Sequence, residues 1–273
     1  MADLARIASN VQAVGTLNSL RMINNKLQVA QTRLATGKRV NSAEDDPAGL
    51  TIGNKFAARL TSMAQAMANI ADAKSMASVA EGGFGGVQDL LSQIRAKAVQ
   101  AANDTIGTDE RSAIRAQITQ YLNQIDAIKG KTTWNGNAVF TSTAINFHVG
   151  ADSTDNLSFS FQAKFDSNEL SLSCVNFTTA AGAESFIASV DDAINSVSAN
   201  QSSLGAILAR LSAQEDTLAV SKVNTEAAWN RIMNADMAEE QVAASKFSIL
   251  QQTSIAMLTQ ANSAPQAILS LFK

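Results

Sequence analysis

The chain has 273 residues, 46% hydrophobic and 16% charged, which excludes a disordered chain and is enough for a substantial core. Its 48 alanines and two prolines favour long helices, because alanine costs least in a helix and proline most. A net charge of -3 gives no general reason to bind nucleic acid, and a single cysteine and a single histidine argue against disulfide frameworks, zinc sites and catalytic triads.

The first predicted element is a helix from about residue 4 to residue 35. Thr36-Gly37 ends it, because glycine commonly follows the last helical turn. Its apolar residues recur at spacings of three and four, with a one-residue drift near Leu17, and form one stripe, which consists of Leu4, Ile7, Val11, Val14, Leu20, Ile23, Leu27, Ala30 and Leu34.

A short acidic segment marks the start of a second helix. Asp46 before Pro47 favours a helix start, because the carboxylate can accept unpaired N–H groups while proline fits the first helical position. The residues expected to form this junction and cap are Asn41, Asp45, Asp46, Pro47 and Gly49. A metal site built from Glu44, Asp45 and Asp46 is the alternative interpretation.

From Ala48 the helical pattern runs to about Ala102, through the segment Gly82-Gly83-Phe84-Gly85-Gly86. Four glycines inside a helix cost about 3–4 kcal/mol relative to alanine. Packing must offset that cost, or the helix is locally loosened. No Lys-Ser/Thr pair follows, which argues against a phosphate-binding loop.

A third helix is expected to be capped by Thr108, with apolar positions at Ile114, Ile118, Leu122, Ile125 and Ile128. Residues 134–177 then predict a small β-rich region, because Trp134-Asn135-Gly136 contains a hairpin-turn signal and the following runs alternate. Within it, His148 should point to solvent and Cys174 should be half-buried, neither serving as a ligand.

Two more helices are predicted after Gly182. The last begins at about Ala235, and Pro265 is expected to break it. In the first, Gln201 and Glu215 are expected to set the register of a coiled-coil seam. That seam consists of Ile187, Val190, Ile194, Val197, Gln201, Leu204, Leu208, Leu211, Glu215 and Leu218.

The predicted fold is mainly α: a long antiparallel helical rod or coiled coil made from paired N- and C-terminal segments, with a small β-hairpin region in the middle. Its expected parts are 1–45 (terminal helix and junction), 46–133 (rod helices), 134–182 (β-hairpin region), 183–231 (return helix) and 232–273 (C-terminal helix pairing with 1–45). A two-helix pair cannot cover all the apolar residues of the terminal segments, so we expect that pair to need neighbours.

No stretch approaches the roughly 20 apolar residues that a membrane helix needs. Residues Met1 to Arg6 lack the apolar core of a cleavable secretion signal. We therefore expect a cytoplasmic protein or one exported without such a signal, and no membrane partner, nucleic-acid partner, cofactor, metal or catalytic residue.

Several segments follow a known pattern in the same order along the chain, namely Arg33–Gly49, Ala98–Asn103, Ile118–Asp126, Phe147–Ala151, Arg231–Ala238 and Gln260–Asn262. Together they resemble the bacterial flagellins. The resemblance covers nearly the whole chain, in a compact form without large outer variable domains. The glycines at 82–86 depart from it, because the family usually continues a helix there.

The resemblance implies a structural subunit, not an enzyme, that self-assembles into the extracellular flagellar filament after unfolded export by the type III apparatus and polymerises at the tip. Implied partners are further copies, the flagellar cap and hook-associated proteins, and a cytoplasmic export chaperone on the C-terminal helix. The inner-helix residues implied in self-assembly are Leu4, Ile7, Val11, Leu20, Ile23, Leu27, Leu34, Phe247, Leu250, Ile255, Leu258, Ile268, Leu271 and Phe272.

Three alternatives remain: a hook–filament junction protein of the same family, an intracellular coiled-coil scaffold, and an enzyme. The segment Arg231–Ala238 favours a filament subunit over the first, and the Asp45–Gly49 junction favours it over the second. A short middle region with one histidine and no recognisable pair of catalytic carboxylates argues against the third.

The resemblance also has implications for recognition by the vertebrate Toll-like receptor that senses flagellin. Flagellins that activate it carry Arg and Leu on a middle helix and Glu on the helix beside it. Here the corresponding residues are Gln93, Lys97 and Gln117. These replace a guanidinium fork, an apolar side chain and a carboxylate, so weak recognition is predicted.

Overall fold

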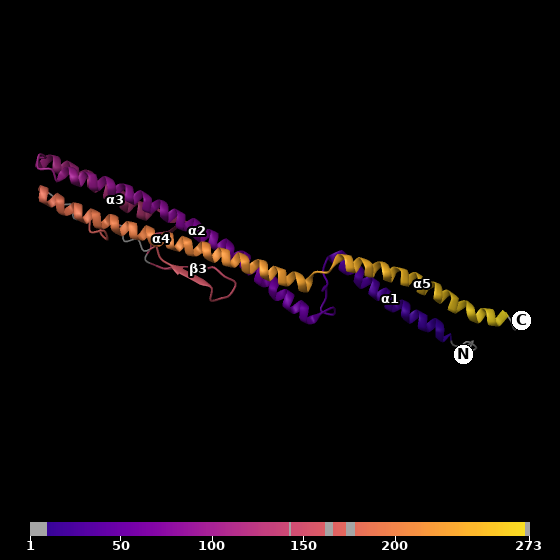
Figure 1. Cartoon of the computed structure of the whole chain (residues 1–273). Helices are drawn as coiled ribbons and strands as arrows, with labels where there is room; N and C mark the ends of the chain where they lie inside the picture. The colour runs from indigo at the N-terminus through magenta and orange to yellow at the C-terminus, as the bar shows by residue number, and fades with distance from the viewer. Residues whose placement is uncertain (1–9, 142, 162–165, 173–177, 271–273) are drawn as a thin grey trace. The chain divides into compact units, whose positions relative to one another are not determined.

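The computed structural model describes residues 10–141, 143–161, 166–172 and 178–270, with side chains to residue 263. Its helices are α1 (Val11–Thr36), α2 (Pro47–Ala101), α3 (Thr108–Lys131), α4 (Ala180–Met233) and α5 (Met237–Ser270) (Figure 1). Two antiparallel pairs join β1 (Thr133–Trp134) to β2 (Asn137–Ala138) and β3 (Ile145–His148) to β4 (Asn156–Phe159). The predicted mainly helical fold with a small β region is confirmed.

Internal contacts divide the chain into two units. The terminal unit comprises residues 1–58 and 224–273 and contains α1 and α5. The central unit comprises residues 59–223 and contains α3 and both strand pairs. Helices α2 and α4 contribute residues to both units.

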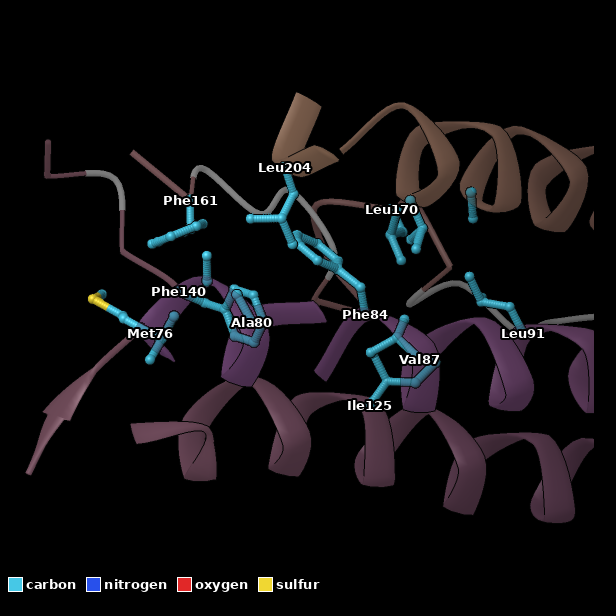
Figure 2. Close-up of a cluster of buried hydrophobic side chains, with 14 of the residues drawn as sticks. Met76, Ala80, Phe84, Val87, Leu91, Ile125, Phe140, Phe161, Leu170 and Leu204 are labelled. Atoms are coloured by element: carbon cyan, nitrogen blue, oxygen red, sulfur yellow. The ribbon is translucent and has the colours of Figure 1, made fainter. Parts of the chain in front are cut away.

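The central unit has a continuous hydrophobic core formed by α2, α3, α4 and the strand region. Phe84 lies within it, and its ring meets that of Phe140 edge to face with the centroids 5.1 Å apart (Figure 2). All ten residues of the predicted α4 seam are buried or half-buried, which confirms the heptad pattern. Glu215 of that seam forms an ion pair with Lys74 of α2.

Helix α2 continues without interruption through the glycines at 82–86. A side chain at Gly83 would lie 2.8 Å from the Phe140 ring, so this glycine permits the close approach of that ring. Positions 82 and 85 face open space. The segment keeps regular helical geometry in the structure, and the phenylalanine between the glycines is buried in the core.

The β region follows its sequence signals. Asn135 and Gly136 connect β1 to β2 with φ of 50° and 80°, as an Asn-Gly hairpin turn requires. His148 is exposed, as predicted, and its Nδ1 lies 2.9 Å from Asn156 Oδ1 on the paired strand. Cys174 lies outside the described residues.

Two helix starts differ from the sequence prediction. Thr108 is not the cap of α3, because the chain is already helical there; Gly107 is the N-cap residue, with extended backbone and no side-chain cap. Helix α4 begins at Ala180 rather than after Gly182. Its cap is Thr179, whose Oγ1 accepts a hydrogen bond from the Gly182 N–H at 3.3 Å.

Pro265 does not break the last helix, which runs from Met237 to Ser270. Proline removes one backbone donor, the N–H that would bond the carbonyl of Ala261 one turn earlier. That carbonyl instead accepts a hydrogen bond from the side-chain amide of Asn10 at 2.7 Å. A residue beside α1 therefore compensates for the bond that proline deletes.

Candidate functional site

Helices α1 and α5 lie side by side in the terminal unit (Figure 1). Among the described residues three polar contacts join them, and residues later on α1 contact residues earlier on α5, so the pair is antiparallel. The contacts link Asn10 with Ala261 at 2.7 Å, Asn24 with Gln251 at 2.8 Å, and Arg33 with Glu240 at 2.9 Å. The pairing of the N- and C-terminal helices expected from the sequence is therefore present.

The seam between α1 and α5 is narrow. The residues buried in it are small, namely Ala30, Ala244 and Ala261. Six predicted stripe residues are half-buried, namely Leu20, Ile23, Leu27, Leu34, Phe247 and Leu258. Sequence reasoning missed the two α5 alanines because it followed larger side chains, although each lies three residues from a member of the stripe.

Larger apolar side chains of both helices remain exposed. Among the predicted assembly residues these are Val11, Leu250 and Ile255. They are joined by Val14, Leu17, Met22 and Val29 of α1 and by Met237, Val242, Ile249 and Met257 of α5. Leu4, Ile7, Leu271 and Phe272 lie outside the described residues, and only the backbone of Ile268 is described.

A groove of about 370 Å³ lies between α1 and α5. Val29, Ala243 and Phe247 contribute its apolar lining. Lys26 places its ammonium 5.9 Å from the centre of the Phe247 ring, within the range of a cation–π contact. The groove is therefore lined by both apolar and charged side chains of the two helices.

The junction holds the end of α1 against the turn between α4 and α5. Gly37 ends α1 with φ of 68°, as predicted. Its carbonyl accepts a hydrogen bond from the Ala235 N–H at 3.1 Å, and the Arg39 N–H donates to the Met233 carbonyl at 2.7 Å. This backbone pairing resembles that of two antiparallel strands.

Asp46 caps α2 as predicted, because its Oδ1 accepts the Gly49 N–H at 2.8 Å. A side chain at position 49 would collide with that carboxylate, which accounts for the glycine. Arg39 Nη2 lies 3.5 Å from Asp46 and donates to the Ile232 carbonyl at 2.8 Å. Arg39 thus links the start of α2 to the end of α4; the sequence gives no local signal for a partner 193 positions away.

Asp45 stabilises the loop before α2. Its Oδ2 accepts the backbone N–H groups of Asn41 and Ser42, each at 3.0 Å. These two bonds lower the pKa of the Asp45 carboxyl from its usual value, and the bond from Asn41 has the larger effect. Asp45 and Asp46 therefore accept hydrogen bonds from backbone N–H groups, and within the described ranges no three His, Cys, Asp or Glu side chains converge on a metal site.

The three receptor-related positions lie in the central unit, two on α2 and one on α3. Gln93 and Gln117 are exposed, and Lys97 is half-buried. Gln117 Nε2 donates to the Tyr121 hydroxyl at 3.0 Å, and Lys97 Nζ donates to Gln100 Oε1 at 3.3 Å. All three are surface residues of their helices.

In the part of the chain that the structure covers, no helix combines the length and apolar character needed to cross a membrane.

Known proteins are similar to nearly the whole of this chain. The model of the bacterial flagellin N-terminal helical region matches residues 7–144, and that of the C-terminal helical region matches residues 187–272.

Similar proteins include the flagellin of Halalkalibacterium halodurans, 32% identical over 98% of this chain and 99% of that protein. A flagellar filament core protein of Brachyspira hyodysenteriae is 29% identical, over 98% and 99% of the two chains. The fold also matches a solved Vibrio parahaemolyticus protein assigned to the flagellar hook-associated class, with a TM-score of 0.57 and 15% identity over 70% of this chain and 100% of that one.

Proposed function

Because the chain belongs to the bacterial flagellin family and is a structural subunit of the extracellular flagellar filament, we propose that its α1–α5 pair carries the contacts between subunits. The supporting observation is the exposure of large apolar side chains beside a seam of alanines. Val242 is 69% exposed, Met257 63% and Ile249 62%. The family is structural, so no catalytic role is involved.

The energetics favour a contact made by many such residues together. Burying one valine, isoleucine or methionine side chain contributes about 1.5–3 kcal/mol. Association costs on the order of 4–15 kcal/mol in lost freedom. Several exposed side chains must therefore be buried at once, and the stripes on α1 and α5 supply them along the length of both helices.

Truncation tests this proposal. Removing residues 1–35, residues 240–273, or both deletes no member of the central core. Each shortened protein should keep the helical circular dichroism of the central unit and should form no filaments in electron micrographs. The full-length Gly82→Ala protein, changed outside the α1–α5 pair, should assemble normally. Filaments formed by a protein lacking both ends would contradict the proposal.

We further propose that the chain is exported unfolded by the flagellar type III apparatus, polymerises at the filament tip beneath the cap, and contacts hook-associated proteins at the filament base. The scarcity of proline suits rapid refolding, because proline isomerisation takes tens of seconds. A cytoplasmic chaperone would bind α5, whose exposed apolar residues suit a helix-binding groove. Val242→Glu should then reduce co-purification with that chaperone when export is blocked; unchanged co-purification would contradict this binding mode.

A hook–filament junction protein is the second candidate. The likeness to the Vibrio protein supports only the shared fold, at 15% identity. The relatives at 32% and 29% identity are a flagellin and a filament core protein, which favours the filament subunit. Quantifying the protein in sheared filaments separates the two, because a junction protein is present in few copies.

For the Toll-like receptor, we propose weak recognition through Gln93, Lys97 and Gln117, which all lie at the surface. Losing one interface anchor commonly costs about 2 kcal/mol, or roughly thirtyfold in affinity. A reporter-cell assay of the monomer should show little activation, and the combined Gln93→Arg, Lys97→Leu and Gln117→Glu protein should show more. Potent activation by the unchanged protein would contradict this proposal.

A further inference from the structure

Asn10 makes two hydrogen bonds with the two ends of its side-chain amide. Its Oδ1 accepts the Ala13 N–H at 3.0 Å and so caps the first turn of α1. Its Nδ2 donates to the Ala261 carbonyl of α5 at 2.7 Å. The first bond needs an acceptor at position 10, and the second needs a donor there.

The Ala261 carbonyl is free to accept this bond because of Pro265. In an α-helix each carbonyl accepts the N–H four residues later, and for Ala261 that residue is proline, which has no N–H. Ala261 is only 5% exposed, so water has little access to compensate. Asn10 supplies the missing donor.

We propose that this Asn10–Ala261 contact fixes the axial register of α1 along α5 and thereby stabilises the filament. The proposal rests on the assembly role proposed above for the α1–α5 pair. A seam of alanines and repeating apolar stripes tolerates a shift by one helical turn, whereas a half-buried side-chain donor that meets one backbone carbonyl fixes one register.

Because its acceptor is a backbone carbonyl, the Asn10–Ala261 contact depends more strongly on the register of the two helices than their other polar links do. Asn24 with Gln251 and Arg33 with Glu240 join two flexible side chains, which can follow a small shift. The Ala261 carbonyl is part of the backbone, and Pro265 determines that it is this carbonyl of α5 that lacks a helical donor. A shifted α1 would leave that carbonyl without its donor and would change which exposed side chains meet the next subunit.

A double-mutant cycle on the full-length chain tests the contact. Asn10→Asp keeps a good N-cap acceptor but removes the donor, and Pro265→Ala restores an N–H for the Ala261 carbonyl. With wild-type seeds, Asn10→Asp should raise the critical concentration for filament growth about fivefold. In the Pro265→Ala background the same change should alter it by at most about twofold.

Asn24→Asp is the matched control, because it adds the same charge to α1 and keeps the oxygen that accepts from Gln251. It should have the same effect in both backgrounds. Equal effects of Asn10→Asp in both backgrounds, or no effect on the wild type, would overturn the proposal. If Asn10→Asp prevents assembly, the double variant must restore it, and failure to do so also overturns the proposal. These outcomes leave the assembly role itself intact, because that role is judged by the truncated proteins.

Discussion

The two units of the molecule bury their apolar residues to very different extents. In the central unit, Phe84, Leu91, Ile94, Ile118 and Ile125 are fully buried in one continuous core. In the terminal unit the residues buried in the described part of the α1–α5 seam are alanines, while valines, isoleucines and methionines of the same helices stay exposed. One unit completes its core within a single chain, and the other leaves apolar surface that further copies can cover.

The physical reason lies in the number of elements that share a centre. In the central unit three helices and the strand region surround the same side chains, so a stripe on each helix is covered from several directions. In the α1–α5 pair two helices touch along one line, and large apolar residues off that line, such as Val14 and Val242, face solvent. A sequence rich in apolar residues thus produces a core in one unit and an interface in the other.

Two phenylalanine truncations should show the largest difference between the two units. Phe84→Ala should lower the free energy of unfolding of the central unit by about 3–5 kcal/mol, because it leaves a cavity in a closed core. Phe247→Ala should leave that value unchanged and should instead reduce filament formation, because Phe247 lines the groove of the terminal pair. Urea unfolding of the monomer, followed by circular dichroism, and filament yield measure the two effects. A large loss of monomer stability in Phe247→Ala would contradict the division.

A pair of glycine substitutions tests how closely Gly83 packs against Phe140 in the central core. Gly83→Ala should destabilise this unit by about 1–3 kcal/mol, because the added methyl group meets the Phe140 ring. Gly82→Ala should stabilise it by about 0.8–1 kcal/mol, because the site is helical and faces open space. Thermal unfolding of the two monomers should shift in opposite directions; shifts of the same sign would refute the role assigned to Gly83.

A modest effect is expected at the junction of the terminal unit. Asp46→Ala removes the cap of α2 and should cost about 0.5–2 kcal/mol, which should lower the melting temperature of filaments or alter their shape without preventing secretion. Asp46→Asn keeps an acceptor for the Gly49 N–H and should lose less. Normal swimming together with an unchanged filament melting temperature in Asp46→Ala would argue against a role for this cap.

Local signals predicted local structure well. The Asn135-Gly136 turn, the Gly37 helix end and the Asp46 cap each depend on residues within a few positions, and each is found as predicted. The Thr108 cap was wrong because two neighbouring positions can cap a helix, and the backbone takes its first helical angles at Thr108 itself. The break at Pro265 was wrong because its compensating donor lies 251 positions from the carbonyl that it serves.

The sequence likewise predicted some residues of the candidate site and missed others. Periodicity was enough to place Leu20, Ile23 and Phe247 on stripes of paired helices, and all three are half-buried at that pair. It could not find Ala244 or Arg39, because an alanine gives a weak signal and the arginine finds its carbonyl partner on another helix. The self-assembly role of the stripe residues stays a prediction for the truncated and substituted proteins.

By itself the sequence determined the helices, their stripes, the hairpin turn and the family, because spacing, turn residues and ordered motifs are properties of neighbouring positions. Only the tertiary structure decided which apolar residues are buried, why Gly83 must be a glycine and how Asn10 compensates for Pro265. The reason is physical: burial and hydrogen-bond satisfaction depend on which distant segments meet, and one helix cannot specify the partners that cover it.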